Sequence, residues 1–314
     1  MKPQRLAHLP TPIHPIDLGT RAKVFLKRDD LTGFALSGNK IRKLEYLLGH
    51  AKSLGMEDVF TCGAVGSNHA RATAWAAARL GMRAHLLLAG EESAPLEGNR
   101  LLDQLIGADI RYVTHEEYDS HRMEIMGDWA DAIGGGYVIG EGGSCGLGSL
   151  GYVDAFEEIR AQEREMGLRF DTFVVTVGSG GTYAGLATGA ALEGQGRSIL
   201  GVSISHPARH FKSVAIPIIL AELEGILKRS LEDVILDVRD GFQGPGYAKN
   251  TDEDLKELAN IIRETGILFD PVYTGKTIRA LKALDEVEDL GNVLFIHTGG
   301  GFGWTPEAVA RIHG

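Results

Sequence analysis

Cysteine is scarce in this chain, which has 2 cysteines among 314 residues. Cys62 and Cys145 stand far apart, without the paired Cys or Cys/His spacing that holds a structural zinc ion. Such sparse use of cysteine is typical of proteins in a reducing compartment. We therefore expect a cytoplasmic protein without a metal site.

Long apolar runs and an excess of positive charge are also absent. No stretch reaches the roughly 18 apolar residues of a membrane-spanning helix, and residues 1–6 lack the apolar core of a signal peptide. The formal net charge is −10, whereas binding to nucleic acid needs a basic face. We therefore expect neither a membrane nor a nucleic acid as partner. A local pocket for a small anion stays possible.

Glycine, by contrast, is abundant, with 42 residues. Many glycines stand in turns that follow short apolar segments such as 58–62, 172–177 and 293–296, which are typical of strands. Segments with helical periodicity alternate with these strands, and the length suits two α/β lobes. The pattern predicts an α/β fold with open, mostly parallel sheets and helices on both faces. Ligands bind at the carboxyl ends of such strands, so the glycine-rich turns are expected to line one cleft.

One of these turns, Gly178-Ser179-Gly180-Gly181-Thr182, separates a predicted strand from a predicted helix. Glycines let backbone N–H groups approach an anion closely, and a helix N-terminus favours negative charge. The turn lacks the Gly-Lys-Ser/Thr ending of a Walker A loop and the third glycine of a dinucleotide fingerprint. We interpret it as a phosphate site. The alternative is a tight turn that uses glycine for steric reasons alone.

Lys40 follows Ser37-Gly38-Asn39 and opens a predicted helix. The partial positive charge of a helix N-terminus lowers the pKa of a nearby lysine, and a Schiff base forms from a neutral amine. The local pattern makes Lys40 a candidate for such a linkage. It does not distinguish Lys40 from Lys43 or Lys276, and a solvated side chain explains any one lysine equally well.

The order of several motifs does distinguish Lys40. They are Lys27 to Gly33, Gly38 to Glu45, Ser67-Asn68-His69, Gly178 to Thr182, Asp270-Pro271-Val272-Tyr273-Thr274-Gly275-Lys276 and His297-Thr298-Gly299-Gly300. Together they resemble the D-cysteine desulfhydrase and 1-aminocyclopropane-1-carboxylate (ACC) deaminase family. The resemblance implies a two-domain, fold type II pyridoxal-phosphate (PLP) enzyme, similar to tryptophan synthase β, that works as a homodimer on a small amino acid. It also implies a large PLP-binding domain of residues 1–47 plus 161–314 and a small substrate-carboxylate domain of residues 48–160.

The same resemblance implies roles for matching residues. Lys40 would hold PLP as a Schiff base and move the substrate α-proton, while the turn from Gly178 to Thr182 would bind the phosphate. Ser67, Asn68 and His69 would bind the substrate carboxylate, and Asn68 would also reach the ring oxygen of the cofactor. Helix capping is the simpler explanation for Ser67 and Asn68, and a place on the helix surface is the simpler one for His69.

Two tyrosines and two threonines complete the expected site. Tyr273 and Tyr247 match active-site tyrosines that could act as acid, base or gate, and they join Lys40 and Ser67 as the expected catalytic residues. Thr274 and Thr298 would face the pyridine nitrogen. A carboxylate there keeps the nitrogen protonated and the ring a strong electron sink, whereas a hydroxyl does so weakly and suits β-elimination. ACC deaminases of the family carry Glu at the position of Thr274, so the chain resembles the desulfhydrase branch.

The expected reaction is therefore β-elimination, with D-cysteine giving pyruvate, sulfide and ammonia. The alternatives are a cysteate sulfo-lyase, an ACC deaminase and an amino-acid racemase, and a non-catalytic anion-binding protein is a more remote one. The cationic segment 205–212 keeps an anionic substrate possible, although a solvated loop explains it more simply. Cys145, where relatives commonly have Asn, is expected to be a small buried thiol.

Overall fold

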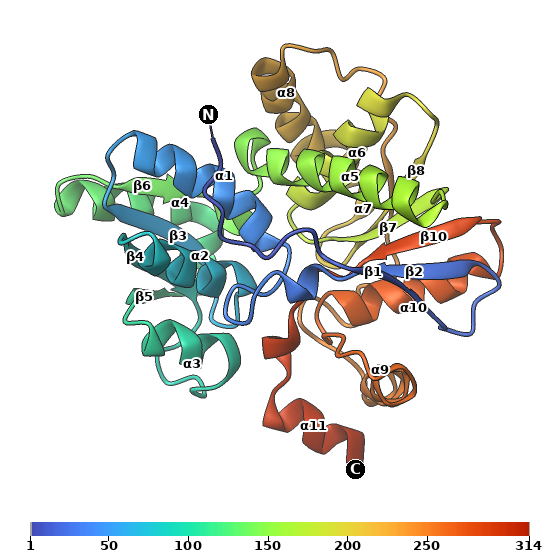
Figure 1. Cartoon of the computed structure of the whole chain (residues 1–314). Coiled ribbons are helices and arrows are strands. Elements are labelled where there is room, and N and C mark those ends of the chain that lie inside the picture. The colour runs from blue at the N-terminus through green and yellow to red at the C-terminus, as the bar shows by residue number, and fades with distance from the viewer. Residues whose placement is uncertain (1, 314) are drawn as a thin grey trace.

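The computed structural model describes residues 2–313 and contains two sheets (Figure 1). The larger sheet has the strand order β1 (Ile13–Ile16), β2 (Lys23–Lys27), β10 (Asn292–Ile296), β7 (Thr172–Val177), β8 (Ser198–Ser203) and β9 (Asp237–Arg239). The smaller sheet has the order β5 (Asp109–Val113), β4 (Arg83–Ala89), β3 (Asp58–Ala64) and β6 (Tyr137–Ile139). Pairing is parallel except between β1 and β2. The predicted α/β class with mostly parallel sheets is confirmed.

Helices cover both faces of each sheet (Figure 1). They are α1 (Lys40–Ser53), α2 (Asn68–Arg79), α3 (Gly98–Leu105), α4 (His115–Ala132), α5 (Gly146–Met166), α6 (Gly181–Glu193), α7 (Ala208–His210), α8 (Ile216–Leu227), α9 (Asp252–Thr265), α10 (Thr274–Asp285) and α11 (Pro306–His313). None of the helices within residues 2–313 combines the length and the apolar character that a membrane crossing requires.

The central strand β7 shows how the sequence builds these layers. All of its side chains are buried, and successive ones point to opposite faces. Phe173 and Val175 pack with α5, α6 and α8, whereas Val174 packs with α9 and α10 on the other face. Full burial of each such side chain contributes about 1.5–3 kcal/mol. This fully buried, mostly apolar strand therefore lies between two helical layers.

The two sheets occupy separate stretches of the chain. The strands of the smaller sheet lie within residues 58–139, between β2 and β7 of the larger sheet. The predicted boundary at residue 160 falls inside α5, which packs against α6 and α8. We therefore propose that α5 belongs with the larger sheet and that the small domain ends before it.

The chain crosses between the sheets at α1 and again at the start of α5. The carboxyl ends of β7 and β10 lead into Gly178 and His297, and the carboxyl end of β3 leads toward Ser67. As a result, the glycine-rich turns of both sheets meet at one place, beside the first turn of α1.

Candidate active site

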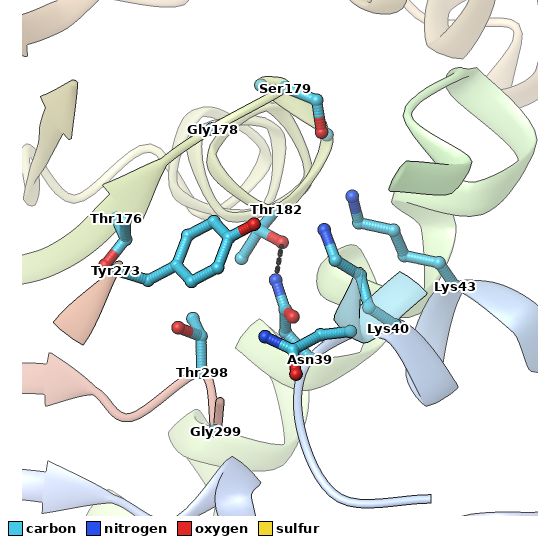
Figure 2. A pocket seen from close by; sticks show the side chains of 13 residues that line it. Asn39, Lys40, Lys43, Thr176, Gly178, Ser179, Thr182, Tyr273, Thr298 and Gly299 are labelled. Atoms are coloured by element: carbon cyan, nitrogen blue, oxygen red, sulfur yellow. Dashed lines mark hydrogen bonds between the residues drawn. The ribbon is translucent and has the colours of Figure 1, made fainter. Parts of the chain in front are cut away.

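A pocket lies where these turns meet, and Figure 2 shows the side chains around it. It is lined by Asn39, Lys40, Lys43, Asn68, Thr176, Gly178, Ser179, Gly180, Gly181, Thr182, Tyr273, Thr298 and Gly299. Lys40 and Lys43 reach in from α1, while Tyr273 and Thr298 lie on the opposite side (Figure 2). The pocket thus unites most of the residues predicted from widely separated motifs.

Lys40 is the first residue of α1. Burial lowers the pKa of its ammonium group to about 8, while the Glu141 carboxylate acts in the opposite direction. The preceding Gly38 has a φ of +107°, and a Cβ there would lie 2.7 Å from the carbonyl oxygen of Thr298. Asn39 donates from Nδ2 to Thr182 Oγ1 over 2.9 Å. The Ser-Gly-Asn-Lys motif therefore brings the buried amine against two of the glycine-rich turns.

The turn after β7 forms a cradle of donors. The backbone N–H of Gly181 donates to Ser144 Oγ over 3.2 Å, and that hydroxyl lies 2.7 Å from Ser179 Oγ. The ammonium of Lys43 donates to Ser144 Oγ over 2.9 Å and to the carbonyl of Gly142 over 3.1 Å. A Cβ on Gly181 would come within 2.7 Å of Lys43 Nζ. Only glycine leaves this space free.

Lys43 and Ser144 were not assigned to the site from the sequence. Burial and the nearby Lys40 hold the pKa of Lys43 well below its ordinary value, and within residues 2–313 neither lysine has a carboxylate partner within 4 Å. The buried amine of Lys43, backbone N–H groups and hydroxyls suit a phosphate dianion. The donor set therefore fits the phosphate group of PLP. The signal for Lys43 was its spacing of three residues from Lys40, on the same face of the helix.

Of the three site residues predicted at the start of α2, one lines the pocket. Asn68 lines the pocket, and Ser67 caps the helix by accepting from the N–H of Ala70 over 3.1 Å. The buried His69 places Nε2 2.8 Å from Thr61 Oγ1, inside the small sheet. Since that hydroxyl donates to a backbone carbonyl, it accepts from His69. The imidazole of His69 is thus not among the groups that line the pocket.

Two tyrosines lie at the outer end of the pocket. The hydroxyls of Tyr247 and Tyr273 are 2.5 Å apart. Tyr273 also lines a neighbouring cavity of about 680 Å³, to which Tyr247 and Asn68 contribute. Burial holds the pKa of Tyr273 well above its ordinary value, so its phenol keeps its proton. The pair therefore stands between the inner pocket and the wider cavity.

The two predicted threonines differ in position. Thr298 lines the pocket, whereas Thr274 is fully buried and does not. Thr274 is the first residue of α10, and its hydroxyl donates to Asp270 Oδ1 over 2.7 Å. Asp270 also accepts from the backbone N–H groups of residues 272–274. The carboxylate caps the helix and engages the hydroxyl that was expected to face the cofactor.

Two departures from the family pattern lie outside the pocket wall. Cys145 precedes α5, and burial raises the pKa of its thiol. His206, Arg209, His210 and Lys212 are exposed to solvent, and none of them lines the pocket or the neighbouring cavity. Their positions favour a solvated segment over a site for an anionic substrate.

Comparison with known proteins extends over nearly the whole chain. Residues 5–299 match the family model described as pyridoxal-phosphate dependent enzyme. A putative ACC deaminase from Pyrococcus abyssi is 43% identical over 284 residues, which cover 88% of this chain and 84% of that protein. A bifunctional D-cysteine desulfhydrase/ACC deaminase, mitochondrial, from Arabidopsis thaliana is 36% identical over 318 residues, which cover 94% of this chain and 77% of that protein. A solved structure of an ACC deaminase homologue superposes with a TM-score of 0.91 at 36% identity, covering 99% of this chain and 96% of that one.

Proposed function

The chain belongs to the family of pyridoxal-phosphate dependent enzymes, and from that premise we propose that it catalyses β-elimination from D-cysteine, releasing pyruvate, sulfide and ammonia. Family membership confirms the predicted cofactor, the enzyme class and fold type II. When bound, PLP supplies an electron sink for the substrate α-carbon. The choice of D-cysteine rests on the residues of this chain.

One observation carries that choice. None of the 13 residues that line the pocket is acidic, and Thr298 contributes a hydroxyl to its lining. A strong electron sink would need a carboxylate beside the ring nitrogen. Asp270 lines the neighbouring cavity, but its oxygens are occupied by Thr274 and backbone N–H groups. A weakly protonated ring suits a reaction in which the β-substituent leaves as the α-proton is lost. A thiolate leaves readily in this way, whereas a cyclopropane ring carbon does not.

The proposed roles of the side chains follow from their positions. Lys40 holds the cofactor and, as a neutral amine, accepts the α-proton. The turn from Gly178 to Thr182, together with Lys43, binds the phosphate. Asn68 and the N-terminus of α2, capped by Ser67, bind the substrate carboxylate. Tyr273, which keeps its proton, orients the substrate together with Tyr247.

ACC deamination is the second candidate, because two relatives that are 43% and 41% identical carry the name putative ACC deaminase. The two reactions differ in their keto-acid product. Elimination from D-cysteine gives pyruvate with sulfide, whereas ring opening of ACC gives 2-oxobutyrate without sulfide. We propose a homodimeric, cytoplasmic enzyme as well, on the basis of the family resemblance.

A substrate panel tests the proposal. The purified protein with PLP is given D-cysteine, L-cysteine, D-cysteate, β-chloroalanine and ACC, and pyruvate, 2-oxobutyrate, sulfide and sulfite are measured. We expect pyruvate and sulfide in equal amounts from D-cysteine and a far lower rate with ACC. Faster turnover of ACC than of D-cysteine would overturn the assignment. Lys40→Arg serves as the control that excludes a contaminating enzyme.

A further inference from the structure

A series of hydrogen bonds through two amide side chains links the pocket to a charged residue outside it. Asn99, in α3, donates from Nδ2 to Asn68 Oδ1 over 2.9 Å and to the carbonyl of Gly66 over 2.8 Å. Its Oδ1 accepts from Nε of Arg71, in α2, over 3.0 Å. The helices α2 and α3 lie side by side (Figure 1). Asn99 and Arg71 are both buried and neither lines the inner pocket, so the mechanism above does not use them.

The chemistry of the partners fixes the direction of every hydrogen bond in this series. A guanidinium can only donate, and a backbone carbonyl can only accept. The amide oxygen of Asn99 must therefore face Arg71, and its NH2 group must face Gly66 and Asn68. Because both hydrogens of that NH2 group are in use, Asn68 must present its oxygen to Asn99. Its own NH2 group is then left to donate, and within residues 2–313 it has no other partner.

The charge of Arg71, at the outer end of this series of hydrogen bonds, strengthens the arrangement. Arg71 has no carboxylate within 4 Å among residues 2–313, and its remaining donors bind the backbone carbonyls of Ala35 and Ser37. Asp103 is buried near it, but burial raises the pKa of that carboxyl to about 8. The guanidinium, which no carboxylate among residues 2–313 contacts within 4 Å, polarises Asn99, and Asn99 in turn polarises Asn68. The N–H groups of Asn68 are thereby made better donors.

We infer that Asn99 is a positioning residue that locks the amide of Asn68 so that its NH2 group donates toward the ring oxygen of PLP. This inference rests on the proposed contact between Asn68 and the cofactor. Arg71 supplies both the orientation and the charge, although it lies outside the inner pocket. A donor at the ring oxygen stabilises its ionised form, in which the Schiff base absorbs visible light.

Asn99→Asp tests the inference with almost no change in volume. The aspartate still accepts from Arg71 but cannot donate to Asn68, so Asn68 must turn its NH2 group toward the new carboxylate and present its oxygen to the cofactor. We expect PLP to bind about tenfold more weakly, as expected for the loss of a hydrogen bond to a charged group. We also expect visible absorbance to be lost to the near-ultraviolet form, in which the ring oxygen is protonated. Titration of the apoprotein with PLP, followed by absorbance, measures both.

A double-mutant cycle shows whether Asn99 acts through Asn68. Asn68→Ala alone should weaken PLP binding about as much as Asn99→Asp, and adding Asn99→Asp to it should change the affinity less than twofold. Asn99→Ala completes the same cycle if Asn99→Asp does not fold. Trp75→Phe is the matched control, because it removes another bond between α2 and α3, from Trp75 Nε1 to the carbonyl of Leu102, without touching Asn68.

Three outcomes would overturn the inference. They are an unchanged spectrum and affinity in Asn99→Asp, an unchanged affinity in Asn68→Ala, and an equal effect of Asn99→Asp with and without the Asn68 amide. The last would mean that Asn99 acts only on the backbone turn at Gly66. No substrate is used in these measurements. A wild-type protein that binds PLP but leaves D-cysteine intact would therefore refute the proposed reaction alone.

Discussion

The two sides of helix α1 differ in whether their cationic side chains have a carboxylate partner. On one side, Arg42 donates to Asp29 and Glu158, and these partners raise its pKa well above its ordinary value. On the other side, Lys40 and Lys43 have no carboxylate within 4 Å among residues 2–313, and burial lowers their pKa values. Arg42 and Lys43 are buried and Lys40 is partly buried, all within one turn of the same helix. The difference is whether the protein supplies the opposite charge.

The two sides of α1 therefore have different functions: one fixes the position of the helix, and the other is available to a ligand. On what we call the anchored side, Arg42 of α1 pairs with Asp29, just after β2, and with Glu158 of α5. Lys27 of β2 pairs with Glu158, and Tyr152 of α5 donates to Asp29. Its charges are satisfied within the protein and are not available to a ligand. The reactive side, made of Lys40 and Lys43, leaves one amine to hold the cofactor and a second, Lys43, whose charge an incoming phosphate would balance. One helix can therefore fix its position with one side and bind a cofactor with the other.

Removing the reactive amine should have the largest effect. We expect Lys40→Ala to lose the visible absorbance of the Schiff base and to slow turnover by roughly 10²–10⁴-fold or more, since both the linkage and the proton acceptor are lost. Borohydride treatment of the wild-type protein should fix PLP to Lys40 in a peptide map. Lys276→Ala is the control, and attachment of PLP at Lys276 instead would refute the assignment.

Breaking the anchored side should unfold the protein rather than change its chemistry. In the pair of Arg42 and Asp29, the side chains are 2% and 1% exposed. We expect Arg42→Met to lower the free energy of unfolding by about 3–5 kcal/mol, because it removes the cation that pairs with the buried Asp29 carboxylate. Urea unfolding measures this loss. Arg83→Ala, at a pair whose arginine is 66% exposed, should cost far less, because solvent screens the pair. Equal losses in the two variants would contradict the contrast.

The pH dependence of cofactor attachment sharpens the contrast. Burial lowers the pKa of Lys40 from 10.5 to about 8, and only the neutral amine attacks PLP. The rate at which apoprotein gains the visible band should therefore rise about tenfold per pH unit below pH 8 and level off above it. A simple alkylamine in the same buffers corrects for the ionisations of PLP itself. A protein rate that kept rising toward pH 10 would show that Lys40 is an ordinary lysine.

The smallest expected effect concerns the second amine. Lys43→Met keeps the length of the side chain but removes its charge, and we expect PLP to bind about tenfold more weakly with the visible band unchanged in position. Lys52→Met, an exposed lysine of the same helix, is the matched control and should bind PLP normally. A loss of affinity in both variants would point to the charge of the whole molecule rather than to the pocket.

Prediction from the sequence succeeded best for elements that their local residue pattern is sufficient to specify. The strand 172–177 is mostly apolar and is found as predicted, and the turn that follows it lines the pocket. The strands predicted over 58–62 and 293–296 and the helix start at Lys40 were likewise found. By contrast, β1, β9 and α11 were not predicted. The two strands are short and lie at the edges of the sheet, and edge strands depend on a neighbour far away in the sequence.

The site was less predictable because side-chain direction depends on distant partners. His69 and Asn68 are adjacent in one motif, yet Thr61 holds the imidazole inside the small sheet. Thr274 was expected in the pocket, but Asp270 binds its hydroxyl. Lys43 was not distinguished from a solvated lysine, because its burial depends on Ser144, 101 residues away. A motif indicates which residues gather, and packing decides which of them face the ligand.

The origin of the pocket walls has a consequence for the order of folding. The lining residues run from Asn39 to Gly299, so no single segment of the chain contains the site. The carbonyl of Thr298, just after β10, accepts from the N–H of Asn39 at the start of α1. Contacts so distant in sequence form late and slowly, and the cradle is completed only when both lobes are joined. We therefore expect the complete PLP site to form only after strand 292–296 has been made and added to the sheet.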